Sequence, residues 1–212
     1  MTTTIFNLDD TAVWVPYDLG DGTYQLLPAG FMGFVPREPH GKVLFLHGWC
    51  SDGSTKSWHI KSLGYDVLTP SLSNWWFSTA VETAQAAYDK FRPDVVVGSS
   101  RGGAVAMNID TGDTPLILLA PAWRRFGDKK TINKSNVTVI HSPNDAAIAH
   151  QDSQLLVSKF GKLISVGEDH RLNCKEGQQA MENALQEYCP AKSDFPTGIS
   201  ETQLAQHRAW ST

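Results

Sequence analysis

Short hydrophobic runs alternate with longer amphipathic or polar segments from about residue 42 onward. Six of the runs are rich in Val, Ile and Leu, as strands that are buried on both faces should be. They are KVLFLHG (42–48), YDVLTP (65–70), DVVVGS (94–99), PLILLAP (115–121), NVTVIHS (136–142) and KLISVG (162–167). Because parallel strands need crossover connections, this alternation predicts an α/β fold with a mostly parallel central sheet.

Four segments predict the helices that flank this sheet, because their apolar residues recur at helical spacing. They cover residues 79–91, 102–110, 149–160 and 175–188. Residues 1–40 differ in texture, since a Gly-Asp-Gly turn between two aromatic-bearing runs predicts a hairpin extension at an edge of the sheet. In the tail 191–212, Ser200 and Gln203 are placed to cap a short helix. We expect one domain over residues 1–212.

The composition is that of an ordinary globular protein, with 41% hydrophobic residues, 19% charged residues and a net charge of −4 over 212 residues. Nucleic acid is not an expected partner, because the chain lacks the basic excess that phosphate backbones attract. No signal peptide is recognisable, and no apolar run approaches the roughly 20 residues that a membrane span requires. We therefore expect a cytoplasmic protein without a membrane span, either a monomer or a small homo-oligomer.

The chain contains three cysteines at spacings that fit no zinc pattern, namely Cys50, Cys174 and Cys189. The expectation is that all three are reduced thiols, with a disulfide between Cys174 and Cys189 as the alternative. No feature of the sequence implies a metal ion or an organic cofactor.

A glycine-lined corner lies in the stretch VVVGSSRGGAVAM, residues 95–107. A sharp strand-to-helix turn that exposes a side chain at its tip needs small residues two positions to either side. Gly98 and Gly102 stand in those positions around Ser100, which identifies Ser100 and not Ser99 as the corner residue. A plain glycine-rich turn is the alternative, but the preceding strand and the following apolar helix favour a nucleophile.

A serine nucleophile needs a histidine to accept its proton and a carboxylate to orient that histidine. His170 and Asp145 follow two later strands, so they should meet Ser100 at the carboxyl edge of a parallel sheet. Other residues of the same types compete for these roles. The rival acids are Asp169 and Asp152, and the rival bases are His47, His59, His141, His150 and His207.

Stabilising a negatively charged tetrahedral intermediate requires preorganised backbone N–H donors. Arg101 follows the nucleophile and should provide one of them. The second should come from the loop after the early strand that LFLHGW (44–49) ends, and we expect it at Trp49, with Cys50 as the alternative.

Together these segments resemble the α/β-hydrolase superfamily of serine hydrolases over roughly residues 42–188. The resemblance rests on FLHGW, VVVGSSRGGAVA, VIHSPNDAAI and VGEDHRL in this order. It implies the α/β-hydrolase fold, a triad of Ser100, His170 and Asp145, and an acyl-enzyme mechanism on ester-like bonds. Only residues 122–135 separate two strands where many members insert a helical cap, so the chain looks closer to small lidless esterases and thioesterases.

We therefore expect a serine hydrolase that acts on a small-molecule carboxylic ester or thioester. The alternatives are another reaction of the same triad, as in a peptidase, acyltransferase, perhydrolase or lyase, or a non-catalytic binding protein on the same scaffold. Trp75, Trp76, Phe77 and Trp123 are expected to line the substrate pocket, unless they belong to the core. Arg101 and the Arg124–Arg125 pair either attract an anionic substrate, such as a coenzyme A ester or an acidic acyl group, or are solvated surface residues.

Overall fold

In the computed structural model, the six predicted strands form one sheet in the order β4-β3-β5-β6-β7-β8, and all neighbouring strands are parallel. Each strand lies within the apolar run that predicted it. The strands are β3 (Lys42–Leu46), β4 (Asp66–Leu68), β5 (Val95–Ser99), β6 (Leu116–Leu119), β7 (Val137–His141) and β8 (Lys162–Ser165). The predicted fold class is therefore confirmed.

The structure describes residues 14–18, 24–28, 39–51, 53–129 and 131–190, and the chain divides into two units, residues 1–38 and 39–212. In the first unit, β1 (Trp14–Asp18) pairs antiparallel with β2 (Tyr24–Pro28). These two strands form a two-stranded antiparallel sheet, in the segment where the sequence predicted a hairpin. The expected cap at Ser200 and Gln203 lies outside the described residues.

Within the described residues, five helices accompany the large sheet. They are α1 (Ser54–Ser62), α2 (Phe77–Phe91), α3 (Arg101–Asn108), α4 (His150–Leu156) and α5 (Lys175–Tyr188). Four were predicted, although α4 ends four residues earlier than expected. The sequence did not predict α1, because its residues are mostly polar and only Ser57 and Ile60 are buried.

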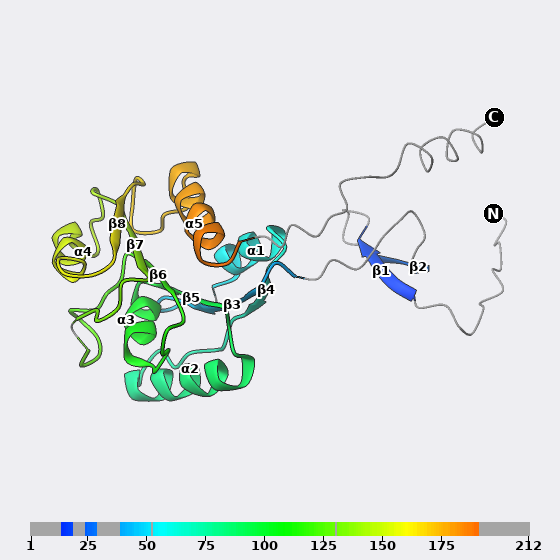
Figure 1. The fold of residues 1–212 in the computed structure, drawn as a ribbon, viewed down its shortest axis with the longest axis horizontal. Helices are drawn as coiled ribbons and strands as arrows, with labels where there is room; N and C mark the ends of the chain where they lie inside the picture. Colours follow the sequence, from blue (N-terminus) through cyan, green and yellow to red (C-terminus); the bar gives the residue numbers. More distant parts are fainter. Residues whose placement is uncertain (1–13, 19–23, 29–38, 52, 130, 191–212) are drawn as a thin grey trace. The chain divides into compact units, whose positions relative to one another are not determined.

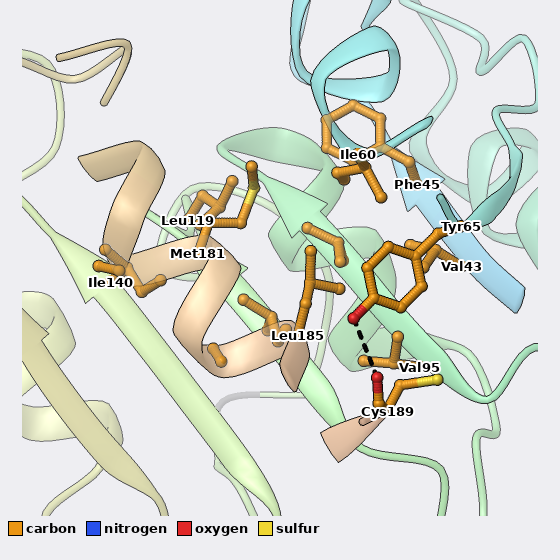
Figure 2. Packing of buried hydrophobic residues seen from close by; sticks show 14 of the residues in the cluster. Val43, Phe45, Ile60, Tyr65, Val95, Leu119, Ile140, Met181, Leu185 and Cys189 are labelled. Atoms are coloured by element: carbon orange, nitrogen blue, oxygen red, sulfur yellow. Dashed lines mark hydrogen bonds between the residues drawn. The ribbon is translucent and has the colours of Figure 1, made fainter. Parts of the chain in front are cut away.

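Successive residues of each strand point to opposite faces of the sheet, and this alternation builds two cores. Val43, Phe45 and Val95 belong to a core that also contains residues of α1 and α5, whereas Leu44 and Val96 belong to a core that contains residues of α2, α3 and α4. In Figure 1, α1 and α5 lie on one face of the sheet, and α2 and α3 lie on the other. Figure 2 shows the first core, where Met181 and Leu185 of α5 lie over the sheet. The Tyr65 hydroxyl closes one end of it by donating to the Cys189 carbonyl oxygen at 2.9 Å.

Two features of this fold leave space for a functional site at the carboxyl ends of the strands. The strand order reverses between β3 and β5, and such a reversal opens a crevice at the carboxyl ends of the strands. Between β6 and β7, the described residues contain no helix or strand, so no helical cap is inserted there.

None of the described helices has the length and apolar character needed to cross a membrane. The three cysteines form no disulfide.

Candidate active site

Ser100 stands at a strained corner between β5 and α3. Its φ of 54° and ψ of −118° lie where residues with a side chain are rarely found, which is typical of a nucleophile elbow. Glycines make the corner possible: a Cβ at Gly98 would lie 2.7 Å from the Gly102 carbonyl oxygen, and one at Gly102 would collide with the Leu46 carbonyl oxygen. The close approach of β5, α3 and β3 therefore explains both glycines.

The structure brings Ser100, His170 and Asp145 together in a chain of hydrogen bonds. His170 Nδ1 lies 2.6 Å from Asp145 Oδ2, and His170 Nε2 lies 2.9 Å from Ser100 Oγ. Because a carboxylate only accepts hydrogen bonds, Nδ1 carries the proton, which leaves Nε2 of the neutral ring to accept the Ser100 hydroxyl. The three residues follow β5, β7 and β8, whose carboxyl ends share one edge of the sheet.

The Asp145 carboxylate is fully buried and held by donors on both oxygens. The backbone N–H groups of Ala147 and Ile148 donate to Oδ1 at 2.7 and 2.9 Å. Burial by itself raises the pKa of Asp145, but the hydrogen bonds from Ile148, His170 and Ala147 outweigh it and leave this pKa below its ordinary value. Asp145 is therefore ionised under neutral conditions.

His141, at the end of β7, is a member of this network that sequence reasoning missed. Its Nε2 lies 2.9 Å from Asp145 Oδ2 and 3.2 Å from the Ile148 carbonyl oxygen, and its Nδ1 lies 2.7 Å from Ser153 Oγ. Since both partners of Nε2 are acceptors, Nε2 carries the proton and Nδ1 accepts from the serine. The sequence offered one signal, a histidine four residues before the acid at a strand end.

The rival acids and bases lie elsewhere. Asp169 accepts the backbone N–H groups of Arg171 and Leu172, and Asp152 pairs with Arg124. His59 pairs with Glu182, and His150 bonds Ser165. His207 lies outside the described residues.

The loop after β3 approaches Ser100 closely. A Cβ at Gly48 would lie 3.3 Å from Ser100 Cβ, so this position has room only for glycine without displacement of the serine. His47 fixes the loop: its Nδ1–H donates to the Gly48 carbonyl oxygen at 2.9 Å, and its Nε2 accepts the Leu72 N–H at 3.1 Å. His47 is thus a structural residue of the loop.

This loop also contains Trp49 and Cys50, the two residues that the sequence suggested as oxyanion donors. Among the described residues, the backbone N–H groups of Trp49 and Arg101 donate to no protein acceptor. The N–H of Cys50, the alternative donor, already donates to Asn74 Oδ1 at 3.0 Å. The structure therefore favours Trp49 over Cys50 for this role.

A cleft of about 900 Å³ opens above Ser100 and His170. Loops that follow β3, β5, β6, β7 and β8 line it, and its described aromatic residues include Trp49 and Phe126. A cleft of this size is typical of a small-molecule site.

The three tryptophans expected to bind substrate do not line this cleft. Trp123 is only 8% exposed, packs in the core against α2, α3 and α4, and donates its indole N–H to the Asp152 carbonyl oxygen at 3.2 Å. Trp75 and Trp76 are 85% and 71% exposed and precede α2 outside the cleft. Phe77 begins α2 and stacks on Phe126 with ring centroids 5.9 Å apart.

Comparison with known proteins identifies the fold. No protein-family model and no curated protein sequence matches the chain. The esterase domain of a Rhodothermus marinus protein is similar at a TM-score of 0.56 and 18% identity, over 84% of this chain and 99% of that one. Est1E from Butyrivibrio proteoclasticus is similar at 0.55 and 17%, over 72% and 88%. Mouse alpha/beta hydrolase domain-containing protein 10 is similar at 0.53 and 14%, over 83% and 97%.

The chain has the α/β-hydrolase fold. This assignment agrees with the expectation drawn from the ordered sequence segments. In this fold, the corner at Ser100 lies beside the reversal of strand order between β3 and β5, at the carboxyl edge where ligands bind in open α/β sheets. The α/β-hydrolase fold hosts many chemistries, so the reaction has to be argued from the residues of the cleft.

Proposed function

We propose that the protein is a serine hydrolase that cleaves a carboxylic ester or thioester through an acyl-enzyme intermediate. The observation that carries this proposal is the hydrogen-bond chain from Ser100 through His170 to Asp145, which opens into the cleft. The neutral ring of His170 has its free electron pair directed at the serine hydroxyl, as a general base requires.

In the first half of the reaction, Ser100 Oγ attacks the substrate carbonyl carbon while His170 Nε2 takes the hydroxyl proton. The buried Asp145 carboxylate stabilises the resulting imidazolium. When the tetrahedral intermediate collapses, the bond to the leaving oxygen or sulfur breaks, and His170 returns the proton to the leaving group. In the second half, His170 Nε2 removes a proton from water as the water oxygen attacks the acyl carbon. The bond between the acyl carbon and Ser100 Oγ then breaks, His170 returns the proton to Ser100 Oγ, and the acid is released.

The Trp49 and Arg101 N–H groups are our candidates for the oxyanion hole. Trp49 lies in the loop after β3 and Arg101 begins α3 directly after Ser100, and neither N–H group has a protein acceptor within the described residues. Losing one such donor costs on the order of 10²–10³ in rate, so their availability bears directly on the proposed chemistry.

The neighbours of the same fold support the choice of substrate. The R. marinus domain is described as an esterase domain. The cleft, without a helical cap inserted between β6 and β7, offers direct access to a small ester or thioester.

Labelling with a fluorophosphonate, read by intact mass and peptide mapping, tests the proposal. We expect one adduct, on Ser100, which Ser100→Ala abolishes. Ser99→Ala is the matched control, because Ser99 is adjacent and also lines the cleft. An adduct on Ser99, or the absence of any adduct, would contradict the proposal and favour a binding protein.

A panel of p-nitrophenyl esters of increasing chain length, with a thioester of matched acyl group, then separates the reactions. A hydrolase of this type turns over at least one member with a dependence on Ser100. A peptidase or lyase would show slow turnover throughout.

A further inference from the structure

Arg101, the residue that follows Ser100, has a buried guanidinium. The residue begins α3 directly after Ser100, and it is only 2% exposed although it lines the cleft. Its Cζ lies 5.5 Å from the ring centroid of Phe77 and 5.5 Å from that of Phe126. The sequence had suggested a solvated surface arginine as one alternative, and the burial of Arg101 excludes it.

No carboxylate among the described residues pairs with this guanidinium, and its Nη2 is buried with no hydrogen-bond partner. Arg124, by comparison, pairs with Asp152 at 3.2 Å. Burial lowers the pKa of Arg101, as expected for a cation that has lost water and gained no counter-charge. Buried charges in proteins are ordinarily paired, and the two phenylalanine rings replace only part of the lost hydration.

The rest of the cleft adds positive charge. Its described lining includes three further cationic residues, Lys56, Arg125 and Arg171, and no acidic one; residue 52 is outside the description. Lys56 Nζ donates to the Arg171 carbonyl oxygen at 2.5 Å, and Arg125 Nη2 donates to the Ala147 carbonyl oxygen at 2.6 Å. Arg101 thus has a buried N–H group without an acceptor, and it lines a cleft whose other described charged residues are all cationic. Such a cleft attracts an anion.

We propose that Arg101 binds a carboxylate on the acyl part of the substrate, so that the enzyme prefers half-esters of dicarboxylic acids over esters of simple fatty acids. This inference rests on the proposed serine hydrolysis. The acyl side is favoured because the acyl group becomes bonded to Ser100, the neighbour of Arg101, whereas the leaving group departs. A guanidinium fork matches the geometry of a carboxylate, and the adjacent Phe126 ring provides an apolar contact for the methylene chain.

The carboxylate makes and breaks no covalent bond in this proposal. It positions the scissile carbonyl against Ser100 Oγ, and the ester hydrolysis described above proceeds unchanged. The charged contact should therefore raise kcat/KM for the anionic ester over a neutral one of equal length by about 10- to 100-fold, as expected of a hydrogen bond between charged groups.

A matched pair of substrates measures this preference: the p-nitrophenyl half-ester of glutaric acid and p-nitrophenyl pentanoate. The quantity of interest is the ratio of their kcat/KM values in the wild type, Arg101→Gln, Arg101→Lys and Arg124→Gln. We expect the wild type to favour the half-ester, Arg101→Gln to lose the preference, and Arg101→Lys to retain part of it. Arg124→Gln removes a neighbouring arginine outside the cleft and should keep the wild-type ratio.

A wild type without preference, or a preference that Arg101→Gln leaves intact, would overturn the inference. If Arg101→Gln fails to fold, the wild-type ratio and Arg101→Lys still decide the question. Turnover of the pentanoate that depends on Ser100 would show that the proposed hydrolysis holds even where the preference fails.

Calorimetric measurement of glutarate binding to Ser100→Ala tests the site without turnover. Glutarate should bind Ser100→Ala and not the double variant that adds Arg101→Gln. Inorganic phosphate is the comparison ligand. Equal binding of phosphate would overturn the assignment to a carboxylate and point instead to a phosphate-bearing leaving group.

Discussion

His141 and His170 donate hydrogen bonds to the same oxygen atom, Oδ2 of Asp145, at 2.9 and 2.6 Å. One histidine faces the cleft, whereas the other is fully buried behind the acid. Together with the two backbone donors on Oδ1, His141 leaves the carboxylate little freedom to rotate. These contacts hold the Asp145 carboxylate in place, and the carboxylate in turn orients the His170 ring toward Ser100.

We predict that His141→Phe lowers kcat about tenfold or more, because it removes one hydrogen bond to the orienting carboxylate. His141→Gln, which retains an N–H donor, should recover part of the activity. The acidic limb of the pH profile should also move to higher pH in His141→Phe, since a carboxylate that has lost a donor is more basic and binds the protonated ring of His170 more tightly.

His150→Gln is the control for this prediction. Its ring lies 5.4 Å from that of His141, centroid to centroid, but its Nε2 bonds Ser165 and not Asp145. The control should keep the wild-type profile. If kcat falls in His141→Phe without any displacement of the acidic limb, His141 supports only the packing and not the orientation of the acid.

The buried His141 also predicts how stability depends on pH. Burial, only partly offset by Asp145, lowers the pKa of His141 below its ordinary value of about 6.5. In the unfolded chain, His141 therefore binds a proton near pH 6.5, whereas in the folded protein it stays neutral to lower pH. The free energy of unfolding consequently falls as the pH drops below about 6.5. His141→Phe removes this contribution. Urea denaturation between about pH 5 and pH 8 should give the variant a flatter dependence than the wild type, and parallel curves would refute the assignment.

Much of the fold was predictable because strands that are buried on both faces appear in the sequence as continuous apolar runs. Val43 to Leu46 and Val95 to Val97 are apolar at every position, since each residue faces one of the two cores. Helix α1 has no comparable pattern of apolar residues. Its single buried apolar residue, Ile60, sets no period, so tertiary contacts decide its conformation.

The candidate site divides in the same way. Ser100 could be located because the glycines that permit its backbone conformation are adjacent in sequence. The direction of a loop side chain has no comparable local signal. Trp123 turns into the core and Trp75 into solvent, although both lie near predicted strand ends. The contact between His141 and Asp145 likewise depends on how the loop after β7 folds back.

The closeness of α3 to β3 predicts unequal costs for two glycine substitutions. In Gly102→Ala the new Cβ would meet the Leu46 and His47 carbonyl oxygens, which belong to a central strand end and cannot move away. We expect a loss of about 3 kcal/mol or more in the free energy of unfolding. Gly112→Ala is the matched control: its φ is 46°, but nothing lies within 4 Å of the new Cβ, so only about 1 kcal/mol of backbone strain is expected. Similar urea midpoints for the two variants would show that α3 can shift away from β3.

The placement of the tryptophans predicts which of them contacts the acyl chain. Trp49 lines the cleft and is 58% exposed there, whereas Trp75 is more exposed but lies outside it. Covering the Trp49 ring with an acyl chain removes apolar surface from water, so Trp49→Ala should raise KM for p-nitrophenyl hexanoate about tenfold and for the acetate much less. Trp75→Ala should leave both values unchanged. Equal effects on the two esters in Trp49→Ala would mean that this ring shapes the loop carrying its own N–H, and does not contact the acyl chain.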